Sequence, residues 1–457
     1  MKRRIFGIET EYGVLCADPD SETPPITAEE AATRVFHDVV ELTRATNTFL
    51  PNGARLYLDI GAHPEYATAE CDQLLDLLHN DRAGDEILAE MAAHATARLN
   101  REGINGHIHL FKNNEDGHHN SYGCHENYLV RRRRDFRARI DSLIPFFVTR
   151  QILVGAGRLR PGGAGFEISQ RATYMQDAVS AASSRTRPMI NTRDEPHADA
   201  EHYRRLHVIV GDSNMADSAT LLKVGMASAL LDAIEVRRPP VLELADPIAA
   251  IQAVSRDLTG KARVHMRAGG TRSAWEIQQL IFDFVQEVYA AEGWDRELSD
   301  TQKYVFELWQ RGLAAIEHDD LTSVATELEW VAKLNLLRRT AERHNLKLAD
   351  PKIARLDLAW HDITARGLRP RLENSGLLRR LTDPAAVSRA RTIPPQTTRA
   401  KMRGDFVALA QEQRRDFMAD WTGLRLISDP VRNALLLDPF ASSDPQVDAI
   451  LEELEND

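Results

Sequence analysis

The chain has 457 residues, of which 43% are hydrophobic and 27% charged, a composition typical of a globular protein with one large domain and a smaller one. Its 57 basic and 68 acidic side chains give a net charge of −11, which argues against a general nucleic-acid-binding protein. Because no run of 18 apolar residues occurs and no apolar segment precedes Glu9, neither a transmembrane span nor a secretory signal is expected.

The first predicted element is a strand over residues 5–14, in which apolar and polar side chains alternate. Phe6 and Ile8 fall on one face, and Glu9 and Glu11 fall on the other. Two carboxylates on one strand face repel each other, and a divalent cation that prefers oxygen ligands, such as Mg²⁺, would offset the repulsion. Taken alone, the pair fits a solvated strand face equally well.

A helix is predicted next, because Thr27 and Glu30 have the spacing of a capping box. Apolar residues continue the helical pattern as far as Leu42. A later helix is predicted to follow Asp81 and to end near Asn100.

The strand predicted over residues 55–60 carries the most informative pattern in the chain. Arg55, Tyr57 and Asp59 share one face, so that a cation, a phenol and a carboxylate lie on a single surface. The other face holds Leu56, Leu58 and Ile60. Glu65 and Glu70 follow after a turn marked by a glycine and a proline. This surface is typical of a site that handles charged ligands.

The rest of the chain becomes mostly helical after residue 212, and the first half mixes strands with helices, which predicts an α+β fold. Further strands are expected over 106–111 and 207–210, and helices over 219–234, 274–291, 301–316 and 324–344. The consecutive prolines Pro394 and Pro395 suggest a linker before a tail with its own apolar residues.

Familiar phosphate-binding loops are absent from the sequence. The segment 155–160 lacks the third glycine of a dinucleotide-binding turn, and Lys261 is followed by Ala262 instead of the serine or threonine of a P-loop. A nucleotide would therefore have to be held on an open sheet surface by metals and side chains.

Several other polar residues remain open candidates. His207 begins a strand-like run and is a possible contact for metal or phosphate, as are Glu11 and Glu70. The arginine run Arg131–Arg134 is more often a solvated helix face, but it could also steer an acidic, disordered partner. Arg204 and Arg205 are rival candidates for that role.

Nine motifs spread over most of the chain resemble the bacterial Pup ligase and depupylase family. They occupy residues 7–13, 52–59, 63–71, 111–114, 121–128, 190–199, 203–212, 395–399 and 420–421. The resemblance implies a glutamine-synthetase-like catalytic domain over residues 1–388, with a curved, mainly antiparallel sheet packed with helices. It also implies a small C-terminal domain over residues 389–457.

The activity implied by the resemblance is ATP-dependent ligation of the small protein Pup to target proteins. The side chain of the C-terminal glutamate of Pup would be joined to target lysines through a γ-glutamyl phosphate, which marks the targets for the proteasome. ATP and Mg²⁺ are the implied cofactors, and neither nucleic acid nor a membrane is an expected partner. The three scattered cysteines fit the cytoplasm, because they have no zinc-binding spacing.

The same resemblance assigns roles to seven residues. The implied general base is Asp59, the implied ATP contacts are Arg55, Thr68 and Trp421, and the implied metal contacts are Glu9, Tyr57 and Glu65. A base is chemically required, because a lysine amine is protonated at neutral pH. Tyr57 is an unusual metal contact, since a neutral phenol is a weak ligand.

Three features favour a ligase over the alternative, a depupylase that hydrolyses the same isopeptide bond. The start reads Gly7-Ile-Glu-Thr-Glu, only 38 residues separate Gly13 from Asn52, and Ile60 follows Asp59. The depupylases of this family tend to differ at each point, with a long insertion before the second motif. A non-catalytic scaffold is disfavoured, because every acid of the motif and its arginine are present.

Overall fold

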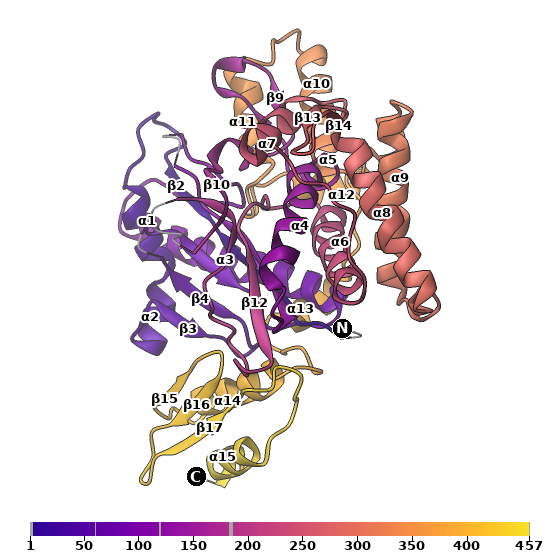
Figure 1. Cartoon of the computed structure of the whole chain (residues 1–457). Coiled ribbons are helices and arrows are strands. Elements are labelled where there is room, and N and C mark those ends of the chain that lie inside the picture. The colour runs from indigo at the N-terminus through magenta and orange to yellow at the C-terminus, as the bar shows by residue number, and fades with distance from the viewer. Residues whose placement is uncertain (1–2, 60, 118–119, 182–185, 457) are drawn as a thin grey trace.

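The computed structural model describes residues 3–59, 61–117, 120–181 and 186–456. The fold is built around an eight-stranded sheet (Figure 1). The strand order is β10-β11-β12-β7-β1-β5-β4-β3, and neighbouring strands are antiparallel except for the parallel pair β10 and β11. The strands are β1 (Phe6–Glu11), β3 (Asn47–Phe49), β4 (Arg55–Leu58), β5 (Pro64–Ala67), β7 (Cys124–Arg131), β10 (Asp177–Ser180), β11 (Pro188–Asn191) and β12 (Tyr203–Val208). The predicted α+β class with a mainly antiparallel sheet is confirmed.

Smaller sheets complete the β structure. Two-stranded pairs are formed by β2 (Gly13–Ala17) with β6 (His107–Phe111), β8 (Arg158–Leu159) with β9 (Phe166–Glu167), and β13 (Arg263–His265) with β14 (Thr271–Ser273). The three-stranded sheet near the C-terminus consists of β15 (Phe417–Ala419), β16 (Gly423–Leu426) and β17 (Arg432–Leu435).

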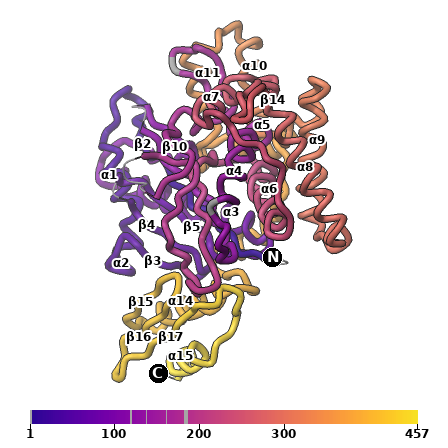
Figure 2. The backbone as a smooth tube through the Cα atoms, in the orientation of Figure 1, coloured from indigo at the N-terminus to yellow at the C-terminus, as the bar shows by residue number. Residues whose placement is uncertain are grey.

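The helices are distributed along the whole chain. They are α1 (Ala28–Val35), α2 (His37–Thr43), α3 (Leu74–Arg101), α4 (Phe136–Thr149), α5 (Gln151–Val154), α6 (Asp217–Val236), α7 (Pro247–Arg256), α8 (Ala274–Ala291), α9 (Asp300–Glu317), α10 (Glu329–Arg343), α11 (Pro351–Ala359), α12 (Arg369–Asn374), α13 (Pro384–Ala390), α14 (Ala400–Glu412) and α15 (Pro445–Asn456). The tube in Figure 2 shows α14, α15 and the last three strands grouped at one end of the molecule, next to β3 and β4.

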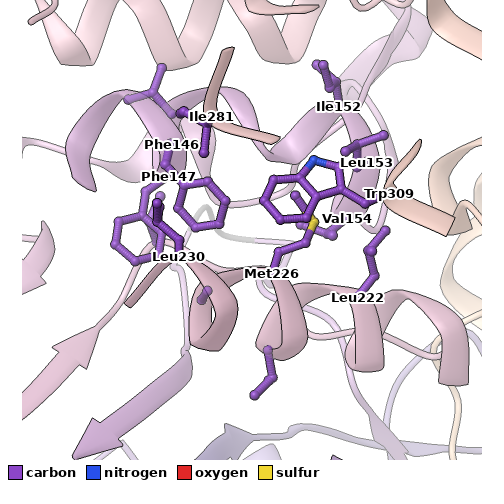
Figure 3. Packing of buried hydrophobic residues seen from close by; sticks show 14 of the residues in the cluster. Phe146, Phe147, Ile152, Leu153, Val154, Leu222, Met226, Leu230, Ile281 and Trp309 are labelled. Atoms are coloured by element: carbon purple, nitrogen blue, oxygen red, sulfur yellow. The ribbon is translucent and has the colours of Figure 1, made fainter. Parts of the chain in front are cut away.

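The main hydrophobic core lies between the eight-stranded sheet and the helices α4, α6, α8 and α9. Trp309 belongs to this core, and its ring lies 5.1 Å from that of Phe282. The same ring lies 6.3 Å from that of Phe146, with which it is shown in Figure 3. A separate cluster joins α14, α15 and the last three strands, and Phe49 from β3 reaches into it. The tail therefore has its own core but packs on the edge of the large sheet.

Several predicted boundaries were wrong. Helix α3 begins at Leu74, seven residues before Asp81, which is a buried counter-ion of Lys112 at 2.8 Å. The predicted start was too late because the sequence does not show that Asp81 is a buried charge within the helix. The strand predicted over 207–210 is the end of β12, which begins at Tyr203 and ends at Val208.

Two predicted helices are also divided differently. The helix of residues 27–42 is interrupted at Phe36, although Thr27 caps it by accepting a hydrogen bond from the Glu30 amide as expected. The helix predicted over 324–344 begins at Glu329, after a 3₁₀ turn. Ile60, placed on the apolar face of the second strand, lies outside the described residues.

Candidate active site

One face of the large sheet carries a polar surface. Successive side chains of a strand point to opposite faces, so every second residue, together with its register partners on neighbouring strands, lies on this face. Across β4, β5, β1 and β7, one row of register partners is Arg55, Ala67, Glu9 and His125. Two residues further along, a second row is Tyr57, Glu65 and Glu11. The two strands that sequence patterning singled out are thus brought together by β5, which lies between them.

The acids of this polar face form clusters with neighbouring histidines. The ligand atoms of each cluster lie within 4.8 Å of one another. The three clusters are Glu9 with His125 and His207, Glu11 with Glu65 and His125, and Glu11 with Asp59 and His63. Glu11 and His207, left open as candidates by the sequence, therefore belong to the site.

Glu65 is buried and lies directly opposite Glu11. Its pKa is raised well above the usual range, first because of burial and then because Glu9 and Glu11 repel its negative charge. The Tyr57 hydroxyl donates a hydrogen bond to Glu65. Burial and the charges of Glu9 and Glu65 also raise the pKa of Tyr57, so it remains a neutral phenol that orients Glu65.

Glu9 is stabilised as a carboxylate by its neighbours. Burial alone would raise its pKa, but a hydrogen bond with His125 at 3.2 Å and the positive charge of Arg205 lower it below the usual range. Burial lowers the pKa of His207 to about 3, and its Nδ1 donates to the Asn127 amide oxygen at 2.8 Å. A neutral imidazole so oriented keeps Nε2 available as an acceptor or ligand.

Asp59 lies just after β4, in the turn to β5, and stays on the polar face as predicted. It accepts a hydrogen bond from the backbone amide of His63 at 2.8 Å, and the His63 ring is 3.7 Å away. Burial tends to raise the pKa of Asp59, but the hydrogen bonds from His63 lower it. Asp59 is therefore ionised and able to accept a proton at neutral pH.

A pocket with about 580 Å³ of empty space, its open mouth included, adjoins this acidic surface. Its wall includes Glu9, Thr68, His197, Arg205 and Trp421. The tail supplies Trp421, whose ring lies 6.3 Å from that of His197. An aromatic wall on one side and a carboxylate on the other suit a ligand with a planar apolar part and a charged part.

Thr68 and Arg55 lie at different places relative to this pocket. The Thr68 hydroxyl accepts a hydrogen bond from the Ile8 amide at 3.0 Å and faces Gly7, where a Cβ would lie 3.2 Å from it. Arg55 lies two strands from β1, donates to the Asn47 side chain at 2.9 Å and stacks over the Tyr57 ring at 4.7 Å. Arg55 is thus part of the polar face rather than of the pocket wall.

Glu70 has a different role from the other acids. Its two oxygens accept hydrogen bonds from Arg399 and Arg403, so they are already neutralised by protein cations. Burial would raise the pKa of Glu70, but the two arginines lower it to about 2. This acid holds the tail to the sheet and is not free to bind a metal.

The two groups of arginines that rivalled each other in the sequence meet on the neighbouring strands β7 and β12, where Arg131 is opposite Tyr203, but Arg205 differs from the rest in its surroundings. Arg205 lines the pocket, 3.9 Å from Glu9, and donates to Asn127 at 2.9 Å. Arg132 and Arg204 both pair with Asp194 on the surface.

Sequence reasoning missed His63, His125, His197 and Arg399 as site residues. The sequence did contain a signal for His125. It lies two residues before Asn127 in a strand-like segment, and this spacing places both polar side chains on the same face of the strand. His197 and Arg399 lie in irregular segments far apart in the chain, which no periodicity connects.

Within the described residues, no helix is both long and apolar enough to cross a membrane. The profile of the family described as Pup-ligase protein matches residues 4–425. The Pup–protein ligase of Sanguibacter keddieii is 51% identical over 456 residues, 99% of each chain, and that of Mycolicibacterium smegmatis is 49% identical over 455 residues, also 99% of each chain.

Two solved structures have the same fold. The complex between Pup and its ligase PafA matches with a TM-score of 0.92 and 42% identity, covering 100% of this chain and 92% of the other. The Pup ligase PafA in complex with ADP matches with a TM-score of 0.84 and 40% identity, covering 94% of both chains.

Proposed function

Because the chain belongs to the Pup-ligase family, we propose that it is a Pup–protein ligase that uses ATP to join the C-terminal glutamate side chain of Pup to lysines of target proteins. The observation that carries the proposal is the juxtaposition of Glu9, Glu11 and Glu65 with the Trp421 pocket. The ADP complex of a relative that is 40% identical supports nucleotide binding by this chain.

In this proposal the adenine lies against Trp421, and the phosphates extend over the sheet toward the acids. Thr68 has a hydroxyl hydrogen available to the ligand, because its oxygen already accepts from the Ile8 amide. Arg55, with a fixed positive charge on the polar face, is assigned to the phosphates. Each of these contacts rests on its position in the site and on the family resemblance.

The donor set fits Mg²⁺, because the raised pKa of Glu65 reflects burial and then the like charges of Glu9 and Glu11, and a cation would relieve the repulsion between these charges. Glu9 and Glu65 would hold the ion with carboxylate oxygens, and Tyr57 would contribute as a weak neutral ligand or by orienting Glu65. When bound, Mg²⁺ neutralises phosphate charge that would otherwise repel the acids.

Two chemical steps are required, because carboxylate oxygen is a poor leaving group. Transfer of the γ-phosphoryl group of ATP to the Pup glutamate forms an acyl phosphate and releases ADP. The neutral lysine amine then attacks the acyl carbon, the isopeptide bond forms and phosphate leaves. Asp59 takes the proton from the lysine ammonium, which its ionised state at neutral pH permits.

The partners and the location follow from the same proposal. Pup and lysine-bearing targets are the protein substrates, the proteasome is the downstream consumer, and the cytoplasm is the compartment. Arg131–Arg134 stay candidates for steering Pup, whereas Arg205 is assigned to the nucleotide because it lines the pocket. A distinct C-terminal domain is supported by the separate core of the tail, but the expected boundary between residues 388 and 389 falls within α13 (Pro384–Ala390).

The test is incubation of the purified chain with ATP, Mg²⁺, glutamate-ended Pup and a lysine-bearing protein. We expect a mass increase of the target by the mass of Pup less one water, with one phosphate released per conjugate. Rapid cleavage of preformed conjugates without net ligation would contradict the proposal and favour the depupylase.

A further inference from the structure

Arg403 on α14 is a fully buried cation at the contact between the tail and the large sheet. Its guanidinium pairs with Glu70 and donates to the Gly53 carbonyl oxygen at 3.3 and 3.1 Å. It also donates to the Trp421 carbonyl oxygen at 3.4 Å. The side chain thus connects three segments that are distant in sequence.

The guanidinium also contacts two aromatic rings. Its central carbon lies 4.8 Å from the ring centre of Phe49 and 4.9 Å from that of Trp421. The two rings meet edge to face, with centres 4.9 Å apart and planes at 88°. Arg403 therefore holds the Trp421 ring against β3 through a cation–π contact, while Glu70 fixes the guanidinium.

Arg399, one helical turn earlier, lines the pocket itself. Its Nε donates to Glu70 at 2.7 Å, and another of its nitrogens donates to the His197 carbonyl oxygen at 2.6 Å. His197 has a φ of 47°, a left-handed conformation that is costly for a residue with a side chain. The hydrogen bond from Arg399 holds that conformation and keeps the His197 ring near Trp421.

We propose that Arg403 is a positioning residue for the nucleotide: fixed by Glu70, it holds the Trp421 ring in the orientation in which the ring forms the wall of the nucleotide pocket. The inference deepens the proposed function and rests on the nucleotide occupying that pocket. It also assigns a function to the C-terminal tail. Trp421 can line the pocket only when the tail is packed on the sheet through the ion pairs of Glu70 with Arg399 and Arg403.

Arginine is required at this position because only a planar cation can stack on rings and pair with a carboxylate at the same time. Lysine would keep the charge opposite Glu70 but lose the flat contact with Trp421. Arg403→Lys therefore separates the orientation of the ring from the neutralisation of the buried acid.

The chain provides a matched control in Arg150. This arginine is also buried, pairs with the buried Glu126 and lies over two rings, 5.5 Å from the centre of Phe146 and 4.6 Å from that of Phe147. It does not line the Trp421 pocket. Arg150→Lys makes the same chemical change in the same kind of environment, without touching the proposed site.

The experiment is calorimetric titration of ADP with Mg²⁺ into the wild type and both variants, well below the unfolding temperature of each. We expect Arg403→Lys to bind ADP about tenfold more weakly and Arg150→Lys to bind like the wild type. In the ligation assay, Arg403→Lys should raise the KM for ATP by a similar factor and leave kcat at saturating ATP near that of the wild type.

Other results would overturn the inference. Equal ADP affinity in the wild type and Arg403→Lys would remove Arg403 from nucleotide positioning while leaving the proposed function intact. A wild-type chain that binds no ADP would overturn both. If Arg403→Lys does not fold, Phe49→Leu removes one of the two rings and keeps the ion pair. An unchanged ADP affinity in that folded variant would contradict the role of the ring contact.

Discussion

Glu65 and Glu70 are five residues apart, both buried, and have opposite electrostatic surroundings. Glu65 lies among the like charges of Glu9 and Glu11, which together with burial raise its pKa. Glu70 lies between Arg399 and Arg403, which lower its pKa to about 2. The comparison teaches that burial alone does not distinguish a functional acid from a structural one, because the neighbouring charges decide which role is possible.

Glu65, which is surrounded by other carboxylates, suits a cationic ligand, since an incoming cation can relieve the repulsion. Glu70 is already neutralised by two arginines and holds the tail on the large sheet. The predictions below test this difference, in order of decreasing expected effect.

The largest effect is expected for Asp59→Asn, which removes the proton acceptor and keeps the shape of the side chain. Lysine conjugation should fall by about 10²- to 10⁴-fold. Hydroxylamine, which is largely unprotonated near neutral pH, should still trap the acyl phosphate as a Pup hydroxamate at an appreciable rate. Product formation with each nucleophile is followed by mass spectrometry.

Asp18→Asn, on the loop after β2, is the control and should conjugate lysine at the wild-type rate. An equal loss of hydroxamate and of lysine conjugate in Asp59→Asn would place Asp59 in formation of the acyl phosphate and remove its role as base.

The next effect concerns stability and Glu70. Glu70→Gln leaves Arg399 and Arg403 without their buried counter-charge, so the free energy of unfolding should fall by about 3–5 kcal/mol. Urea unfolding at pH 7 measures it. The half-exposed Glu102 pairs with Arg34 on the surface, and Glu102→Gln should cost less than about 1 kcal/mol. Equal losses in both variants would mean that the buried pair is no stronger than a surface pair.

The pH dependence of the free energy of unfolding should reveal the contribution of Glu70. The pKa of Glu70 is about 2 in the folded chain, below the ordinary 4.5, so its stabilisation is complete above about pH 4.5 and is lost as the pH falls toward 2. The difference in unfolding free energy between the wild type and Glu70→Gln should therefore shrink by up to about 3 kcal/mol over that range. Urea unfolding at pH 6, 4.5 and 3.5 tests this, and a difference that stays constant with pH would contradict the assignment.

The smallest effect is expected for Glu65→Gln without ligands. Glutamine replaces an acid whose ionised form is disfavoured by burial and by Glu9 and Glu11, so the free energy of unfolding should stay unchanged or rise by up to about 1 kcal/mol. The glutamine oxygen can still accept the hydrogen bond from Tyr57. Urea unfolding in the presence of a chelator measures the change, and a loss comparable to that of Glu70→Gln would mean that the two acids do not differ as described.

Alternation along single strands was enough to find Glu9, Glu11, Arg55, Tyr57 and Asp59, because a side-chain period of two places them on one face whatever the pairing is. The register that brings β1 next to β5 could not be read from either strand. That register is what makes Glu65 face Glu11.

Charge balance was the feature that the sequence concealed most. Glu70 looked like a site acid because its partners, Arg399 and Arg403, are more than 300 residues away in the chain. The helix was expected to follow Asp81, because its buried partner Lys112 lies 31 residues away, just after β6, and the sequence does not show that pairing. The conformation of His197 depends on Arg399 in the same way, through a contact that no local pattern encodes.

The most direct test of the account is the thermal stabilisation by ADP, measured with and without Mg²⁺, in the wild type and in Glu65→Gln. If the Glu9, Glu11 and Glu65 surface binds the metal and the Trp421 pocket binds the base, ADP should raise the Tm of the wild type more with Mg²⁺ than without it. In Glu65→Gln the metal-dependent part of this rise should disappear and the metal-independent part should remain. A metal-dependent rise of the same size in both proteins would contradict the assignment of Glu65 to the metal.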